Sequence, residues 1–209
     1  MEKIDLTKLH KGYYTAKTHP ELVTIEAADF LSIRGKGDPS SAEYAETIQA
    51  LYATAYAVKF MYKADKKDFT VAKLEGLWWF DDAKYGHISM EDAPLKIPRS
   101  EWEYRMLIRM PDFVTEEAIS DAKQQVANKK GIALANTVEL YPMNEGLCIQ
   151  MLHVGPFNTE PESLQLIKEF SEANGLLKNG LHHEIYLSDF RKTAPEKLKT
   201  ILREPVKNK

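Results

Sequence analysis

Near the end of the chain, a carboxylate, a phenol and a hydroxyl stand at alternate positions: Glu184, Tyr186 and Ser188. In a β-strand these three share one face, and Ile185 and Leu187 point to the other. A carboxylate beside aromatic rings is partly desolvated, which raises its pKa. Such a group can attract a cation, activate a water molecule or protonate a leaving oxygen. We predict that Glu184 and Tyr186 are catalytic; the alternative is an exposed strand glutamate.

Aromatic residues are frequent in the segments expected to surround these groups. In a second predicted strand, Trp102 and Tyr104 lie on the same face. Their rings could stack on a flat ligand and stabilise positive charge, whereas core packing is the alternative for any single ring. Strand alternation lets only one of Trp78 and Trp79 face the ligand, and we favour Trp79. The predicted ligand-binding residues are Trp79, Trp102, Tyr104, Tyr141, His153 and Phe157.

The sequence contains no recognisable metal or cofactor motif. A strand would point His182 and His183 to opposite faces, so they could not easily hold one ion. No histidine or cysteine spacing indicates zinc, and no Gly-x-Ser-x-Gly elbow is present. Gly35-Lys36-Gly37 lacks the ending of a phosphate-binding loop. We therefore predict no metal and no cofactor, and for His153 either a ligand contact or a simple hydrogen-bonded role.

The composition is that of an ordinary globular protein. The chain has 209 residues, 44% of them hydrophobic and 28% charged, with a formal net charge of −3. No basic field covers it, so we predict no nucleic-acid partner. The lone Cys148 lies in an apolar run and is expected to be a buried, inert thiol. Neither a signal peptide nor a membrane span is indicated, so we predict a soluble, cytoplasmic protein with no membrane partner.

Hydrophobic periodicity and turn residues predict the elements that must position these groups. A helix begins at a cap on Ser40 or Ser41, a second at Thr115 and a third at Thr159, where Glu162 completes a capping box. Gly131 and Gly175 end the second and third helices. Residues 203–209 are polar and basic and are expected to fray. The predicted strands are 24–34, 69–80, 101–110, 137–141, 146–154 and 183–190.

The order of these elements suggests an internal duplication. Aligning Gly37 with Gly155 places two strands and two turn-to-helix connections in register, and the strands at residues 103–106 and 184–187 then close the two halves. Joining two open sheets would remove exposed edges and create a concave seam, where pockets are common. We predict one domain, 1–209. Its parts are halves 24–112 and 113–190, an N-terminal arm 1–23 and a C-terminal tail 191–209.

Three stretches resemble the GyrI-like small-molecule-binding superfamily: Val154-Gly155-Pro156-Phe157, Leu74-Glu75-Gly76-Leu77-Trp78-Trp79, and the strand from His183 to Asp189. The resemblance implies an α+β fold of two pseudo-symmetric strand–helix–strand–strand units, with an antiparallel sheet and a ligand pocket between them. It also implies that a buried glutamate and aromatic rings hold the ligand. One stand-alone branch hydrolyses the strained cyclopropane of DNA-alkylating natural products inside an aromatic cage.

Two functions are consistent with these residues. The first is a hydrolase that binds aromatic xenobiotics and opens a strained cyclopropane electrophile, with Glu184 and a tyrosine hydroxyl positioning water. The second is a non-catalytic protein that sequesters or senses such compounds in the same pocket. Inhibition of a DNA-handling protein such as gyrase is a weaker interpretation, since the sequence offers no distinctive surface for such a partner. For the hydrolase and for the sequestering or sensing protein, the predicted partner is an aromatic small molecule.

Overall fold

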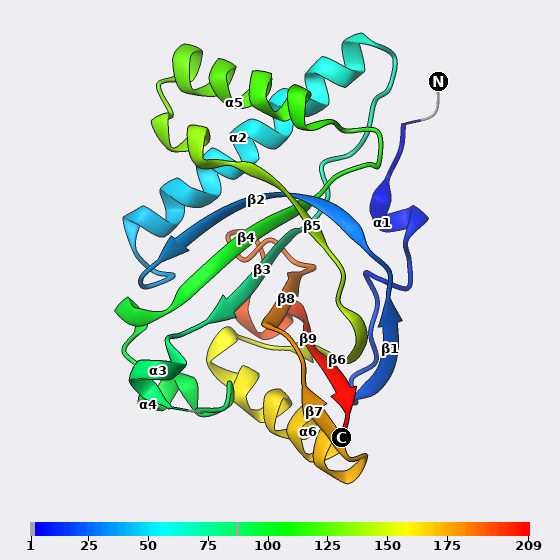
Figure 1. The fold of residues 1–209 in the computed structure, drawn as a ribbon, viewed down its shortest axis with the longest axis vertical. Coiled ribbons are helices and arrows are strands. Elements are labelled where there is room, and N and C mark those ends of the chain that lie inside the picture. Colours follow the sequence, from blue (N-terminus) through cyan, green and yellow to red (C-terminus); the bar gives the residue numbers. More distant parts are fainter. Residues whose placement is uncertain (1–2, 87) are drawn as a thin grey trace.

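A computed structural model describes residues 3–86 and 88–209, and its ribbon is drawn in Figure 1. One twisted sheet runs through the molecule, with α2 and α5 at one end of the view and α6 at the other. The strands are β1 (Glu21–Ile25), β2 (Ala28–Lys36), β3 (Leu74–Trp79), β4 (Glu103–Arg109), β5 (Glu139–Met143), β6 (Gly146–Val154), β7 (Leu176–Lys178), β8 (His182–Tyr186) and β9 (Lys199–Asn208).

Three long helices and several short turns join these strands. Within the described residues, the α-helices are α1 (Leu6–Leu9), α2 (Ala42–Ala64), α3 (Asp82–Tyr85), α4 (Ala93–Lys96), α5 (Glu116–Lys130) and α6 (Glu160–Ala173). Short 3-10 turns span η1 (Arg99–Glu101), η2 (Ala133–Thr137), η3 (Phe157–Thr159) and η4 (Pro195–Lys197). None of the described helices is both long and apolar enough to cross a membrane.

The sheet confirms the predicted α+β fold of two related units. Its strand order is β1-β6-β9-β8-β3-β4-β2-β5, with β7 paired to β9, and every strand pair is antiparallel. Outward from the β3–β8 seam, one unit runs β3-β4-β2 and the other β8-β9-β6. The flanking strands are exchanged, since β1 precedes β2 but pairs with β6, and β5 precedes β6 but pairs with β2. A pseudo-two-fold axis therefore passes through the seam.

Two predictions about the end of the chain are wrong: that the strand at residues 184–187 closes the second half, and that residues 203–209 fray. β8 corresponds to β3, and the second unit closes with β9, which lies between β6 and β8. Ile201, Leu202 and Arg203 are fully buried. The basic residues of this segment suggested solvent exposure, but the Arg203 guanidinium is held by partners from distant parts of the chain. The predicted division into halves at residue 112 stays a prediction.

Helices α2 and α6 cover the same face of the sheet. Tyr186 of β8 packs in the core under α2, and Leu202 of β9 packs under α6. Glu184 lies directly opposite Leu202 in the β8–β9 register, and residues opposite each other share a face. The alternate residues of β8, including Glu184 and Tyr186, therefore lie on the floor between α2 and α6.

Two of the three predicted helix caps are confirmed. The Ser41 hydroxyl accepts from Tyr44 N at 3.2 Å and that of Thr115 accepts from Ala118 N at 3.3 Å. Gly131 ends α5 in the left-handed conformation. Thr159 makes no side-chain cap. Its hydroxyl donates instead to Pro156 O at 2.8 Å, so the capping box predicted there is wrong.

A buried network of charges ties the N-terminal arm to the opposite face. We call Tyr13, Glu75, Glu145, His183 and Arg203 the arm network. The His183 imidazole lies 3.0 Å from both Glu75 Oε2 and Glu145 Oε1. Arg203 donates to Glu145 Oε2 at 3.3 Å and to Tyr13 O at 3.0 Å, and the Tyr13 hydroxyl donates to Glu75 Oε2 at 2.5 Å. Each buried charge thus has an opposite charge or a donor beside it, which offsets the cost of burial.

We expect Arg203→Ala to destabilise the fold by about 3–5 kcal/mol, because removing one member of a buried pair leaves the other charge uncompensated. Urea denaturation measures the change. Lys207→Ala is the matched control, since Lys207 is exposed on the same strand. Equal free energies of unfolding for the two variants would show that the tail is not anchored through Arg203.

Candidate functional site

The centre of the site is a hydrogen-bonded chain that crosses the β3–β8 seam. The Tyr186 hydroxyl donates to Glu184 Oε2 at 2.7 Å. Trp78 lies across the seam on β3, and its indole Nε1 donates to the Tyr186 oxygen at 3.0 Å. An indole N–H can only donate, so the tyrosine proton is directed at the carboxylate. Burial and then the charge of Glu184 raise the pKa of Tyr186 far above its usual value, which keeps the phenol neutral.

A histidine occupies the second oxygen of Glu184. His182 Nε2 lies 3.2 Å from Glu184 Oε1, and His182 Nδ1 lies 2.7 Å from Glu204 Oε1. Carboxylates only accept, so both ring nitrogens donate and the imidazole is a cation. Burial opposes that charge, but Glu204 and Glu184 outweigh it and raise the pKa of His182 to about 10. We call Trp78, Tyr186, Glu184, His182 and Glu204 the seam chain.

Aromatic rings surround one end of the seam chain. Trp78 lies 5.5 Å from Tyr104 and 6.0 Å from Trp102, measured between ring centroids. Tyr44 of α2 meets Tyr104 edge to face at 5.0 Å. On the other side, the half-exposed Phe157 approaches Tyr186 at 6.0 Å. These rings form an aromatic wall beside one carboxylate; Trp78, Tyr104 and Tyr44 are buried, and Phe157 is its most exposed ring.

Two glycines make room for the rings. A Cβ on Gly76 would lie 2.9 Å from Trp78 Nε1 and 3.1 Å from the Tyr186 hydroxyl. A Cβ on Gly35 would lie 2.4 Å from the Tyr104 ring. Gly76 stands opposite Glu184 in the seam register. Only a residue without a side chain therefore lets the indole reach across the seam to Tyr186.

A second glutamate lies buried near the first. Glu160 is the first residue of α6 and is only 7% exposed. No group in residues 3–86 or 88–209 hydrogen bonds to its Oε1. Burial and then the charge of Glu184 raise the pKa of Glu160 well above its usual value, while His182 and the Thr200 hydroxyl act in the opposite direction. Burial and the charge of Glu184 thus both disfavour the charged form of Glu160.

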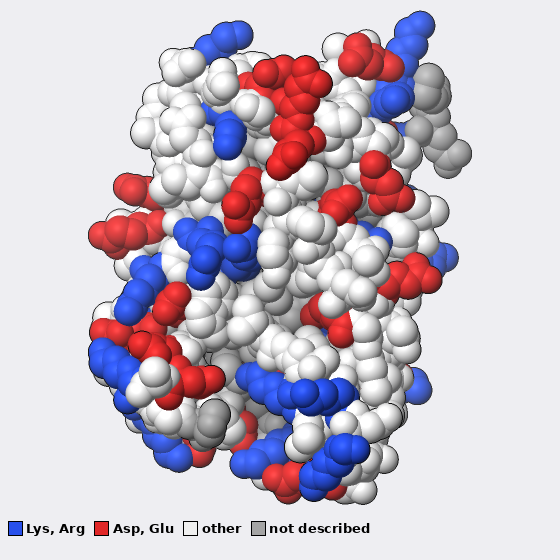
Figure 2. All heavy atoms as spheres, viewed as in Figure 1, with Lys and Arg blue, Asp and Glu red and all other residues white. Residues whose placement is uncertain are grey.

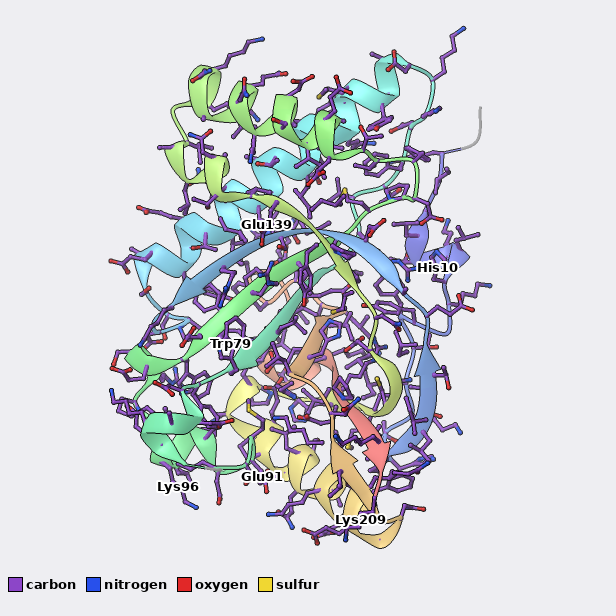
Figure 3. All side chains as sticks on the ribbon, in the orientation of Figure 1. His10, Trp79, Glu91, Lys96, Glu139 and Lys209 are labelled. Carbon is purple, nitrogen blue, oxygen red and sulfur yellow. The ribbon has the colours of Figure 1, made fainter. Side chains whose placement is uncertain are left out.

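A cleft of about 640 Å³ opens beside α6. Its apolar lining comes from α6, the segment before α4 and the neighbouring strands, and includes Met90, Leu164 and Ile167. Glu91, labelled in Figure 3, also lines the cleft and pairs with Lys168 of α6 at 2.7 Å. Glu204 lines the cleft and also belongs to the seam chain. Acidic and basic side chains are interspersed over the face drawn in Figure 2.

The structure brings together five of the predicted site residues: Glu184, Tyr186, Trp102, Tyr104 and Phe157. Glu184 and Tyr186 lie on the floor of the site, and the three rings lie beside it. Trp78 of β3 links the two groups, because its ring lies near Trp102 and Tyr104 and its Nε1 donates to Tyr186. Their roles in ligand binding and catalysis stay predictions.

Three predicted residues do not contact the seam chain. Trp79 is on the opposite face of β3 from Trp78, under the Arg34 guanidinium, and lines the cleft beside α6. Trp78 lies beside Tyr186 and Glu184 but does not line that cleft, so the choice of Trp79 as the residue that faces a ligand stays a prediction. Tyr141 is stacked against Arg105 on that opposite face. His153 lies near Ser163 and Thr159 at the start of α6, the hydrogen-bonded alternative.

Sequence reasoning missed His182, Glu160 and Tyr44. His182 was weighed only as a metal ligand, although strand alternation places it on the same face as Glu184 and Tyr186. The described residues hold no group of three or more acidic, histidine or cysteine side chains arranged for a metal ion. Glu160 reads as an ordinary acidic residue of a first helical turn, and nothing in the sequence marks it as buried.

The fold and this seam define a small-molecule-binding protein of two duplicated units. A family model for the GyrI-like small molecule binding domain matches residues 111–207. An uncharacterised conserved protein from Listeria innocua is 40% identical with a TM-score of 0.87, covering 98% of this chain and 100% of its own. A hydrolase from Listeria innocua is 39% identical with a TM-score of 0.84, over 98% and 100%. The chain belongs to the GyrI-like family.

A more distant likeness shows the fold alone. The C-terminal domain of EcmrR is 12% identical with a TM-score of 0.58, covering 91% of this chain and 98% of its own. No protein with a curated description matches the chain.

We expect Gly76→Ala to disturb the seam chain, because the new methyl group would displace Trp78 or Tyr186. Overpacking of this kind costs about 1–3 kcal/mol. Urea denaturation and the near-ultraviolet circular dichroism of the indoles measure the effect. Gly12→Ala is the control, since a Cβ there meets nothing within 4 Å. An unchanged indole spectrum in Gly76→Ala would contradict the geometry.

We also expect His182 to stabilise the fold in a pH-dependent way. A pKa raised from 6.5 to about 10 means that its contribution is fully present below pH 6.5 and is lost as the pH rises towards 10. The difference in unfolding free energy between the wild type and His182→Gln should therefore shrink across that window. His19→Gln, at an exposed histidine, controls for general charge effects. A constant difference would show that His182 is not charged at neutral pH.

Proposed function

We propose that this protein hydrolyses strained cyclopropane electrophiles carried by flat aromatic xenobiotics, and so detoxifies them. The observation that carries the proposal is the Glu184–Tyr186 pair, 2.7 Å apart and set among aromatic rings. Two solved structures 39% identical to the chain are named hydrolases from Listeria innocua. The family description, a small-molecule-binding domain, supports the binding half of the proposal.

The aromatic wall would bind the substrate and stabilise its charge. Opening a cyclopropane by water develops positive charge at the attacked carbon and negative charge on the part that leaves. The proposal requires the faces of Trp78, Trp102 and Tyr104, which lie beside one another, to stack on a flat ring system. Indole and phenol faces attract positive charge by about 0.5–2 kcal/mol, more when water is excluded. The wall would therefore stabilise the transition state more than the uncharged substrate.

Glu184 would accept a proton from the attacking water. His182 and Tyr186 each take one lone pair of its two oxygens, and each oxygen keeps another. His182 Nε2, 3.2 Å from Oε1, would hold the carboxylate by a charge-assisted hydrogen bond. Tyr186 holds the carboxylate in one orientation, because Trp78 fixes the direction of the tyrosine proton. A base held this way can position water with little reorganisation.

The cleft beside α6 would admit the substrate. Its volume of about 640 Å³ is within the range of about 300–1,000 Å³ of pockets that hold drug-sized ligands. Its apolar lining favours an aromatic body, and Glu204 belongs to both the cleft lining and the seam chain.

We expect Glu184→Gln to lower turnover by about 10²–10⁴-fold, because the amide cannot accept the proton of water. Binding should persist, since the aromatic wall is unchanged. Mass spectrometry of a cyclopropane-bearing alkylator, incubated with catalytic amounts of protein, measures the gain of one water. Glu46→Gln, at an exposed glutamate on α2, is the matched control and should behave as the wild type.

The same experiment separates catalysis from sequestration. Many turnovers by the wild type and few by Glu184→Gln would support the hydrolase. A compound that stays bound to the wild type with an unchanged mass would instead identify a drug-binding protein, and full activity in Glu184→Gln would remove Glu184 from the mechanism.

A further inference from the structure

Glu160 is a buried acid with an unused oxygen. Glu160 is only 7% exposed, yet within residues 3–86 and 88–209 its Oε1 has no hydrogen-bond partner. A buried polar atom without a partner costs about 1–3 kcal/mol. Such an atom calls for an explanation beyond packing, and a bound ligand is one that supplies the missing partner.

The neighbours of Glu160 place it over the floor of the site. The Thr200 hydroxyl is a hydrogen-bonding neighbour of its carboxyl group, and the charges of Glu184 and His182 act on it. Thr200 lies opposite Tyr186 in the β8–β9 register and opposite His153 in the β6–β9 register. The Glu160 side chain therefore points from the start of α6 towards the part of β8 that carries the Glu184–Tyr186 pair.

Nothing in the role of a helix start requires this burial. The first turn of a helix favours a carboxylate anion, because the helix dipole is positive there. Glu162, in the same turn, is exposed and can meet that preference in water. Glu160 is turned inward instead, where burial and then the charge of Glu184 oppose its charged form.

We propose that Glu160 is a second catalytic carboxyl group, which donates its proton to the oxygen of the electrophile while Glu184 accepts the proton of water. The inference rests on the proposed function and names the acid that the reaction needs. Two carboxyl groups whose surroundings separate their protonation states are a recurring arrangement for acid–base catalysis.

The step balances for a cyclopropane fused to a cyclohexadienone. The water oxygen bonds to the cyclopropane CH₂, and the CH₂–C bond breaks. Its electron pair moves through the ring to the carbonyl oxygen, which takes the proton of Glu160 and becomes a phenol. Glu184 takes the proton of water. The substrate has then gained one H₂O, and transfer of a proton from Glu184 to Glu160 restores the enzyme.

The test compares the wild type, Glu160→Gln and Glu162→Gln on a model spirocyclopropyl cyclohexadienone. We expect kcat of Glu160→Gln to fall by about 10²–10⁴-fold with KM little changed, and Glu162→Gln to match the wild type. The wild-type rate should also fall as the pH rises through the raised pKa of Glu160, and Glu160→Gln should lack that fall. The other titratable groups on the sheet face under α6 are His182, Glu184 and Tyr186 of β8, Glu204 of β9 and His153 of β6, and all remain in the variant.

A second measurement reads the proton directly. The infrared spectrum of the wild type at pH 7 should contain a band of a neutral carboxylic acid, and Glu160→Gln should lose it. Glu160→Asp keeps the acid but shortens its reach; it should shift the band and retain an intermediate rate, and it serves if the Gln variant does not fold.

The outcomes distinguish the two proposals. Hydrolysis by the wild type with an equal rate in Glu160→Gln would overturn the role of Glu160 and leave the proposed function standing. No hydrolysis by the wild type would overturn both. An infrared spectrum of the wild type without a neutral acid band at pH 7 would also exclude Glu160 as the donor.

Discussion

The β3–β8 seam is the constraint on which the rest of the molecule depends. Gly76 stands opposite Glu184 and Trp78 opposite His182 in its register. A slip of one residue would turn each of these side chains to the other face. The seam therefore joins the two units and, by the same pairing, fixes which aromatic ring meets which carboxylate. Since Gly76 has no side chain, the indole and the phenol meet across it without strain.

The two faces of this seam hold their charges differently. On the arm face, Glu75, Glu145, His183 and Arg203 are fully or almost fully buried and each has a partner of opposite charge or a donor. On the helix face, Glu184 keeps free lone pairs and Glu160 keeps an unused oxygen. A satisfied network contributes stability and specificity to the attachment of the arm. Unused hydrogen-bonding capacity, in contrast, is available to a ligand.

The sequence predicted the elements better than their pairing. Periodicity and capping residues located α2 and α5, and strand alternation placed Glu184 and Tyr186 on one face. β9 was missed because its Lys and Arg residues indicate solvent exposure, and the partners that neutralise Arg203 come from distant segments such as Tyr13. The choice between Trp78 and Trp79 depends on which face the helices cover. That is a property of the assembled sheet, which no local pattern contains.

Glu160 and Glu184 show why residue type alone could not assign roles in this site. Glu184 has an imidazolium on one oxygen and a phenol on the other, and both donate hydrogen bonds to it. Glu160 is buried, one of its oxygens has no hydrogen-bond partner within residues 3–86 and 88–209, and burial and the charge of Glu184 raise its pKa. The two sites are linked, because the charge of Glu184 acts on both His182 and Glu160. In the mechanism we propose, the surroundings of these two identical side chains, and not their residue type, make one the base and the other the acid.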